Sequence, residues 1–376
     1  MSFGLGVTLF FVALLLAVLI HEAGHFAVAK WFDFKVEEFF VGFGPRVWSF
    51  RRGETEYGVK AFPLGGYVKV AGMNPFKEEA PEDVPRSYGA KPAWQRALMI
   101  LAGPGTHILV ALVLYALYLG IVGQPHLTAQ ITQVVPKLNG RTSPASAVGL
   151  RAGDAVARVG PVSDPTTDQF GAYLKHHVGT PITMAVERNG RILRVTVTPI
   201  LSMVQGELVP RVGTLMSDRH LVGRDRAGVV GAVSGAIDAI GRGLVQTFQG
   251  LGRVFGPSGL GHLFGVLFGS QQRRITDPVS PVGIGRAAGQ TVQYFGFGEL
   301  LPLLAGVNLF VGLINLVPLP PFDGGHLAVL TVETIRGRKV DQRKLVPVAA
   351  IVLLFLGFFV MASLFLDIAK PLNIRP

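Results

Sequence analysis

The chain has 376 residues, of which 16% are charged and 49% hydrophobic, and its formal net charge is +11. Soluble domains carry about 25% charged residues, so this composition and a mean hydropathy of +0.44 indicate a membrane protein. The length allows two or three structural units. Cysteine is absent, which excludes disulfides and thiolate metal ligands. No basic cluster alternates with aromatic residues as on a nucleic-acid-binding surface, so no nucleic acid is expected as a partner.

Four long apolar segments predict four transmembrane helices, since an apolar helix of about 20 residues crosses a bilayer. The segment between the first two and the short loop after the third are rich in Lys and Arg, which predicts that both face the cytoplasm. Both chain ends and the long 123–298 segment are then expected outside. The predicted transmembrane helices are residues 3–30, 97–122, 299–317 and 345–366.

Residues 55–73 (TEYGVKAFPLGGYVKVAGM) combine β-prone residues with a Pro-Leu-Gly-Gly turn, which predicts a β-hairpin of unusual apolarity. It is either an ordinary cytoplasmic hairpin or a strand pair that dips toward the membrane, which is tolerated only where protein buries its backbone. We expect an N-terminal membrane core over residues 1–122, which includes this hairpin, and a C-terminal membrane core over residues 299–376.

Residues 127–200 predict one small α+β domain. Asn189-Gly190, between its last two expected strands, is a strong signal of a tight hairpin. Residues 201–298 are expected to form a linker and amphipathic helices at the membrane surface, because 226–270 combines spaced apolar residues with Arg at intervals. The expected elements of the small domain are strands at 129–135, 154–159, 182–187 and 192–198 and helices at 143–150 and 167–177.

The first apolar segment ends in His21-Glu22-Ala23-Gly24-His25, an H-E-x-x-H motif. On a helix, positions i and i+4 share one face, so both imidazoles can bind one metal ion, with the glutamate beside it. Ionisable groups at the end of an apolar segment are costly and mark functional sites. The alternative, a helix end that reaches out of the membrane, would use Lys or Arg. The motif therefore predicts a metal site.

A third protein ligand is needed, because a catalytic zinc ion usually has three and a water molecule. Without cysteine it must be His, Asp or Glu. Glu37 and Glu38 are close in sequence but lie outside the apolar helix. Asp323 is the better candidate, since it follows the third apolar segment in a proline-broken stretch whose irregular backbone can line a cavity at membrane depth. The alternative is an ordinary turn-forming aspartate.

Two further polar residues lie in the same stretch. His326 is either a fourth ligand or a group that contacts a ligand. Asn315 either hydrogen-bonds a substrate backbone or an oxyanion, or only ends its helix.

With these motifs in this order, the chain resembles the site-2 protease family, and within it the bacterial RseP-like intramembrane metalloproteases, over nearly its whole length. The resemblance implies a multi-pass α-helical membrane protein with four transmembrane helices, a membrane-associated β-hairpin and one inserted extracytoplasmic PDZ-like α+β domain. The motifs that carry it are His21–His25, Val41-Gly-Phe-Gly-Pro45, Pro63-Leu-Gly-Gly-Tyr-Val-Lys69, Ala102-Gly-Pro104, Ser143–Asp154 and Asn315-x-x-Pro-x-Pro-x-x-Asp-Gly-Gly325.

The resemblance also implies roles for individual residues. His21, His25 and Asp323 would bind Zn²⁺ and Glu22 would be the catalytic base, while the hairpin would present the substrate as a strand. The family has the sequence Gly-Pro-x-x-Asn where this chain has Gly103-Pro-Gly-Thr-His107. The role of the family's polar Asn side chain is then either taken by His107 or lost. As a further histidine near the site, His107 could instead perturb metal binding. The residues expected to bind substrate or contact the ligands are Gly65, Gly66, Tyr67, His107 and Asn315.

The expected function is regulated intramembrane proteolysis in the bacterial cytoplasmic (inner) membrane. The lipid bilayer would surround the enzyme, and the substrates would be single-span membrane proteins such as anti-sigma factors or remnant signal peptides. An upstream site-1 protease would supply trimmed substrate. One alternative is a membrane metal transporter or sensor with the same ligands, which needs no carboxylate base at Glu22. Another is a PDZ-based membrane scaffold with an inactive site.

Overall fold

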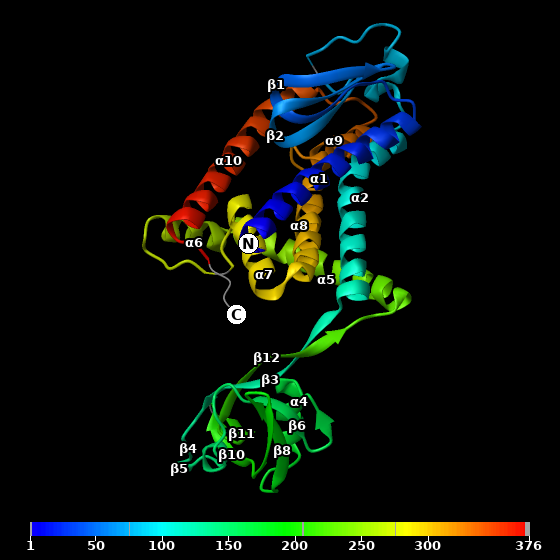
Figure 1. The fold of residues 1–376 in the computed structure, drawn as a ribbon. Coiled ribbons are helices and arrows are strands. Elements are labelled where there is room, and N and C mark those ends of the chain that lie inside the picture. The colour runs from blue at the N-terminus through cyan, green and yellow to red at the C-terminus, as the bar shows by residue number, and fades with distance from the viewer. Residues whose placement is uncertain (1, 75, 205–206, 275, 373–376) are drawn as a thin grey trace. The chain divides into compact units, whose positions relative to one another are not determined.

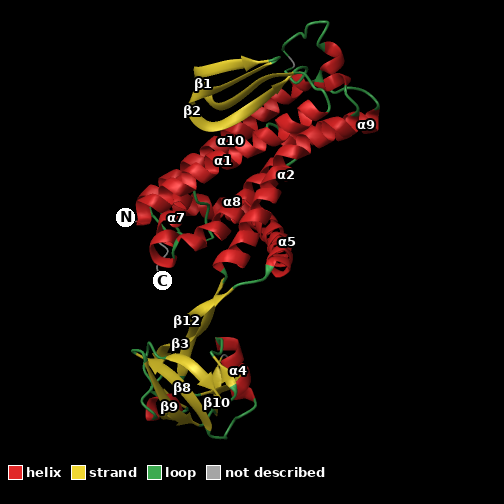
Figure 2. Cartoon of the chain, turned by 45° about the vertical axis from the view of Figure 1, so that its right-hand side comes forward, coloured by secondary structure: helices red, strands yellow, loops and turns green. Residues whose placement is uncertain are grey.

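The computed structural model describes residues 2–74, 76–204, 207–274 and 276–372. The chain divides into two compact units, Met1–Ile121 with Ala227–Pro376, and Val122–Arg226. The first unit is mainly helical and the second mainly β-structure (Figures 1 and 2). The helices of the first unit are α1 (Ser2–Trp31), α2 (Ala93–Leu117), α5 (Val229–Phe255), α6 (Pro257–Leu267), α7 (Pro281–Phe295), α8 (Leu300–Asn315), α9 (Asp323–Arg336) and α10 (Val346–Ala369).

The four apolar segments are all helical, as predicted. Four helical stretches in the described part of the chain are long and apolar enough to cross a membrane, which agrees with a multi-pass membrane protein. One turn of π-helix, Tyr118–Val122, continues α2, and short 3₁₀ turns precede α8 and α10. The four stretches are Phe3–Trp31, Ala93–Val122, Phe297–Asn315 and Gln342–Ala369.

Glycine lets α1 approach two other helices closely. A methyl group on Gly24 would lie 2.7 Å from Thr106 Cγ2 and 2.8 Å from the Ala102 oxygen, so α1 and α2 touch through their backbones at the end of the H-E-x-x-H motif. A methyl group on Gly6 would lie 2.9 Å from the Ala288 oxygen of α7. Substitution of either glycine would force the helices apart, because packed interiors have no spare volume.

The segment 201–298 is more than the linker and surface helices that the sequence predicts. Helices α5 and α6 are present, but α7 packs into the helical core, where Ala288 and Val292 form a buried cluster with Phe10 and Leu300. The small residues of α7 recur every three or four positions and so make one face that α1 can approach closely.

The predicted hairpin is part of a larger sheet than residues 55–73 and has a further turn. Strand β1 (Val36–Arg52) pairs with β2 (Thr55–Val70), and the tight turn lies between Arg52 and Thr55, where Gly53 has φ +63°. Pro-Leu-Gly-Gly lies where β2 itself reverses direction, between Val59 and Gly66, which both pair with Val41. Residues 38–41 pair with 56–59 on one side and with 66–69 on the other, so the last part of β2 forms an edge of this sheet. Figure 2 shows both strands, which pack against α1.

An ionic cluster anchors the turn between β1 and β2 to the end of α1. The carboxylate of Glu54 accepts hydrogen bonds from Arg86 at 2.7 and 2.9 Å and from Lys30 at 2.5 Å. The Arg86 and Lys30 cations outweigh partial burial and lower the pKa of Glu54 to about 2, from 4.5. A depressed carboxyl pKa contributes stability that is fully present above the unfolded pKa and is lost as the pH falls through the folded pKa.

The second unit is built on a sheet of order β12-β3-β6-β8-β9. Asn189 and Gly190 have φ of +53° and +75°, as the predicted Asn-Gly turn requires. Its core includes Ile131, Val156, Met184 and other apolar side chains contributed by the sheet and by α4. The elements are β3 (Gln124–Val134), β4 (Lys137–Leu138), β5 (Arg141–Thr142), α3 (Pro144–Ala147), β6 (Ala155–Val159), β7 (Val162–Ser163), α4 (Thr167–Lys175), β8 (Ile182–Arg188), β9 (Arg191–Val197), β10 (Ile200–Val204), β11 (Glu207–Arg211) and β12 (Thr214–Asp225).

This unit extends beyond the expected end at residue 200. Strand β12 pairs with β3 from Thr214–Val134 to Asp225–Gln124, so residues that were expected in a linker complete the sheet. The pairing joins residues 80 to 101 positions apart in sequence, and no local pattern marks such a partner.

We expect Glu54→Gln to lower the thermal midpoint of the purified protein by a few degrees at pH 7, because it removes the charged partner of Arg86 and Lys30. The difference from wild type should shrink between about pH 4.5 and pH 2, as the native carboxyl protonates. Exposed Glu82→Gln is the control. A difference that stays constant down to about pH 2.5 would contradict this explanation.

Candidate metal centre

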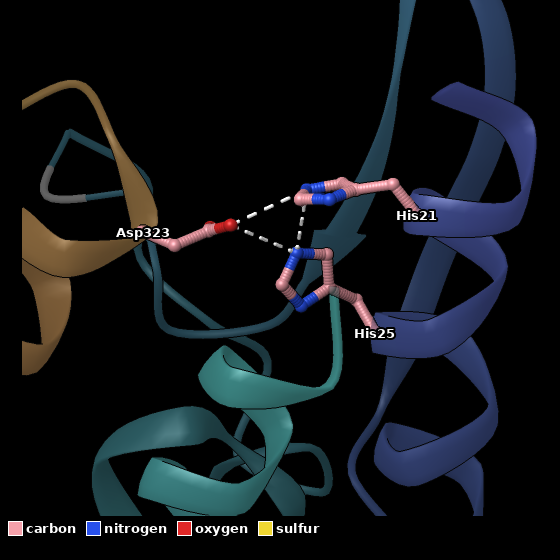
Figure 3. A group of neighbouring side chains, drawn as sticks. All are labelled: His21, His25 and Asp323. Atoms are coloured by element: carbon pink, nitrogen blue, oxygen red, sulfur yellow. Dashed lines mark hydrogen bonds and ion pairs between the residues drawn. The ribbon is translucent and has the colours of Figure 1, made fainter. Parts of the chain in front are cut away.

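Three side chains from the two ends of the chain meet inside the helical unit (Figure 3). His21 and His25 lie one helical turn apart on α1, and Asp323 is the first residue of α9. The Nε2 atoms of the histidines are 3.1 Å apart, and each is 3.3 Å from Asp323 Oδ2. The predicted set His21, His25 and Asp323 is therefore brought together.

These distances fit a tetrahedral zinc site. Ligand atoms about 2.0–2.1 Å from a tetrahedral zinc ion lie roughly 3.3 Å apart, which is close to all three edges of this triangle. Asp323 Oδ2 is buried and accepts no hydrogen bond from the described residues. Two imidazoles and a carboxylate are also a usual ligand set for catalytic zinc, with the fourth position left for water. The residues present thus fit the metal.

The backbone of α2 orients one of the two imidazoles. His25 Nδ1 lies 2.7 Å from the Met99 oxygen, and a carbonyl can only accept, so Nδ1 carries the proton. The lone pair is then on Nε2, which faces Asp323 and His21. Ligating histidines usually have such a partner, which fixes both the tautomer and the ring orientation.

Glycines make room for the ligands. A methyl group on Gly103 of α2 would overlap both imidazole rings, because it would meet His25 Nε2 and lie 2.7 Å from His21 Cε1. Methyl groups on Gly324 and Gly325 would meet the backbone of residues 316–320 at 2.3–2.9 Å. The loop after α8 therefore folds closely against the first turn of α9 and holds Asp323 at its start.

The ionised form of Asp323 is favoured by its neighbours. Burial alone would raise its pKa, but the imidazoles of His21 and His25 outweigh burial and hold the pKa of Asp323 well below its usual range. A charged carboxylate at this position can bind a cation.

Glu22 faces a cavity of about 190 Å³ that also contains the three ligand side chains. Val68 of β2 lines the same cavity. A methyl group on Gly66 would lie 3.0 Å from Glu22 Cγ, so the edge strand passes directly beside the glutamate. The carboxylate is thus next to the histidine–aspartate triangle without being part of it.

The other predicted site residues have mixed positions. Tyr67 lines the cavity, and its hydroxyl donates to Glu38 at 2.5 Å, whereas Gly65 packs against the ring of Phe43. His326 also lines the cavity but lies outside the ligand triangle, and burial lowers its pKa. Asn315 ends α8 and is absent from the described lining, so a role for it stays a prediction.

His107 and one residue that sequence reasoning missed lie behind His21. The His107 ring centre is 5.0 Å from that of His21, and His107 Nδ1 is 2.9 Å from Asn308 Oδ1 of α8. Asn308 could have been identified from the sequence, because an amide within an apolar helix needs a hydrogen-bond partner when it is buried. Only the fold identifies His107 as that partner.

We expect Gly103→Ala to weaken metal binding by roughly 10- to 100-fold, the range found when ligand orientation is disturbed. The added methyl group would occupy the place of His25 Nε2. Gly105→Ala in the same helix is the control, because its methyl group would meet nothing within 4 Å. The measurement is competition with a metal chelator. Equal affinities for the two variants would contradict the role of Gly103.

Comparison with known proteins gives the family. The Rip1 zinc metalloprotease of Mycobacterium tuberculosis is 36% identical over 409 residues, and the alignment covers 100% of both chains. The Rip1 protein of Mycolicibacterium smegmatis is 32% identical over 408 residues, again with 100% of each covered. A solved PDZ domain of an SdrC-like protein from Listeria monocytogenes matches 24% of this chain and 88% of its own at 17% identity, with a TM-score of 0.21. Peptidase family M50 matches residues 9–360, and the chain belongs to this family.

Proposed function

We propose that the chain is an intramembrane zinc endopeptidase in which His21, His25 and Asp323 hold Zn²⁺ and Glu22 is the general base. The observation that carries this proposal is the triangle of two Nε2 atoms and Oδ2, with edges of 3.1–3.3 Å, beside a fourth side chain suited to proton transfer. Family membership supports peptide hydrolysis, and the names of the relatives support zinc.

The chemistry divides between the metal and Glu22. A bound zinc ion supplies a Lewis acid that polarises the scissile carbonyl and lowers the pKa of water toward about 7. Glu22 takes the proton from the attacking water and returns it to the leaving amine. The Met99 oxygen keeps the lone pair of His25 directed into the site through both steps.

The edge of β2 is placed to hold the substrate as a strand. Within the described part of the chain, residues 66–69 pair with β1 along one side, and Val68 lines the cavity beside Glu22. A helical segment hides its carbonyls in internal hydrogen bonds, so it must unwind before cleavage. Pairing with this edge replaces those bonds, as in other cases of strand addition.

The proposed substrates are single-span membrane proteins, such as anti-sigma factors or remnant signal peptides, in the bacterial inner membrane. The location of the site supports this, since the ligands lie on or beside helices that are long and apolar enough to cross a bilayer. The basic segment 30–96 and the loop after α9 face the cytoplasm by the positive-inside rule, which places the second unit outside the cytoplasm. There it acts as a PDZ-like module that selects substrates already trimmed by a site-1 protease.

A metal transporter or sensor would use the same ligands. Such a protein has no need for a carboxylate in the position of Glu22, beside both the metal site and an unpaired strand edge. Membership of a peptidase family also favours hydrolysis.

The deciding experiment is a cleavage assay on single-span reporters in detergent or liposomes. We expect Glu22→Gln to slow cleavage by roughly 100- to 10,000-fold while zinc stays bound, because only the base is lost. Asp323→Asn should lose both zinc and activity. Cleavage by Glu22→Gln at the wild-type rate would exclude the mechanism, and full zinc occupancy in Asp323→Asn would exclude Asp323 as a ligand.

A second prediction concerns the shape of the substrate. Two glycines placed next to the cleavage site of a reporter should raise kcat/KM severalfold, because glycine lowers the cost of unwinding the helix. The same pair at the far end of the span is the control. If both reporters are cleaved at the same rate, unwinding of the substrate helix for pairing with the β2 edge does not limit the cleavage rate.

A further inference from the structure

One ring nitrogen of the metal centre lacks a partner. His21 Nε2 faces Asp323 and His25, while His21 Nδ1 is buried and has no hydrogen-bond partner among the residues that the structure describes. If Nε2 is a metal ligand, the neutral ring carries its proton on Nδ1. A buried donor without an acceptor is costly, and ligating histidines usually donate this proton to a neighbouring group.

The ring of His107 in α2 contacts His21, and among the described residues its hydrogen bond is made through Nδ1, to Asn308. Asn308 donates from Nδ2 to the Leu304 oxygen at 2.9 Å, which turns Oδ1 toward His107 Nδ1, also at 2.9 Å. Since an amide oxygen only accepts, His107 Nδ1 must carry the proton, and the lone pair of the neutral ring is on Nε2. Asn308 thereby fixes the tautomer of His107.

The two rings are close enough to bond. Their centres are 5.0 Å apart and their planes are tilted by 39°. Imidazole rings at this separation can bring one nitrogen of each to within about 3 Å by a small rotation.

We propose that His107, held by Asn308, accepts the Nδ1 proton of His21 and so orients this imidazole toward the metal. Both are positioning residues: neither contacts the reacting atoms. The inference rests on the proposed metal site. It gives His107 a definite role in this chain and makes α8 part of the support of the metal centre through Asn308.

The test compares two substitutions at one position by chelator competition for zinc. His107→Phe keeps a ring but removes the acceptor, and we expect the zinc Kd to rise by roughly 10- to 100-fold. His107→Gln offers an amide oxygen near the place of Nε2, and its Kd should stay within about threefold of wild type. His177→Phe in the second unit is the matched control, because it removes a ring nitrogen that lies 2.9 Å from an oxygen, there the backbone oxygen of Tyr173.

Wild-type affinity in His107→Phe would overturn the inference, as would a loss in His107→Gln equal to that in His107→Phe, since packing alone would then explain both. Asn308→Leu provides a second route: it leaves both histidines in place but removes the bond that fixes His107, so it should also weaken zinc binding. Unchanged binding in Asn308→Leu counts against the role of Asn308. If Asp323→Asn binds zinc as tightly as wild type, the proposed metal site itself has failed, which separates the two outcomes.

Discussion

The convergence of two imidazoles and a carboxylate on one point constrains most of the helical unit. His21 and His25 come from the first helix and Asp323 from a helix about 300 residues later, yet their ligand atoms lie 3.1–3.3 Å apart. A carboxylate with a buried oxygen, such as Asp323 Oδ2, is tolerated only when it is paired or binds a metal. The helices must therefore hold this geometry to within a few tenths of an ångström for the metal to bind.

Close backbone contacts provide that precision. Gly24 brings α1 against α2, Gly103 leaves space for the imidazoles, and Gly324 holds the start of α9 against the preceding loop. The Met99 oxygen, also on α2, then fixes the His25 ring. Helix α1 carries both histidines and the proposed base, and it also contacts β2, so the metal, the base and the strand edge share one support. This explains how an enzyme built largely of apolar helices can place polar groups accurately.

The sequence was most informative where chemistry restricts the choice of residues. The H-E-x-x-H spacing predicted one helical face, and the absence of cysteine left few residue types for a third ligand; both inferences agree with the geometry around Asp323. The four long apolar helices could also be predicted, because a helix that crosses a bilayer must be both long and apolar.

Contacts between elements that are far apart in sequence could not be predicted. The sequence predicts a hairpin over residues 55–73 alone, whereas residues 38–41 of β1 lie between the two parts of β2 and pair with both. Strand β12 pairs with β3, although the rest of the second unit lies between them in sequence. Helix α7 has the composition of a surface helix but packs into the core through its small residues. In each case the deciding contact lies far away in sequence, beyond the reach of local periodicity.

X-ray absorption spectroscopy of the zinc-loaded protein tests the central claim most directly. The spectrum should fit four light ligands at about 2.0–2.1 Å, of which two are imidazoles. A fit that requires three or four imidazoles, with His107 or His326 bound to the metal, would contradict the assignment of His21, His25 and Asp323 as the protein ligands.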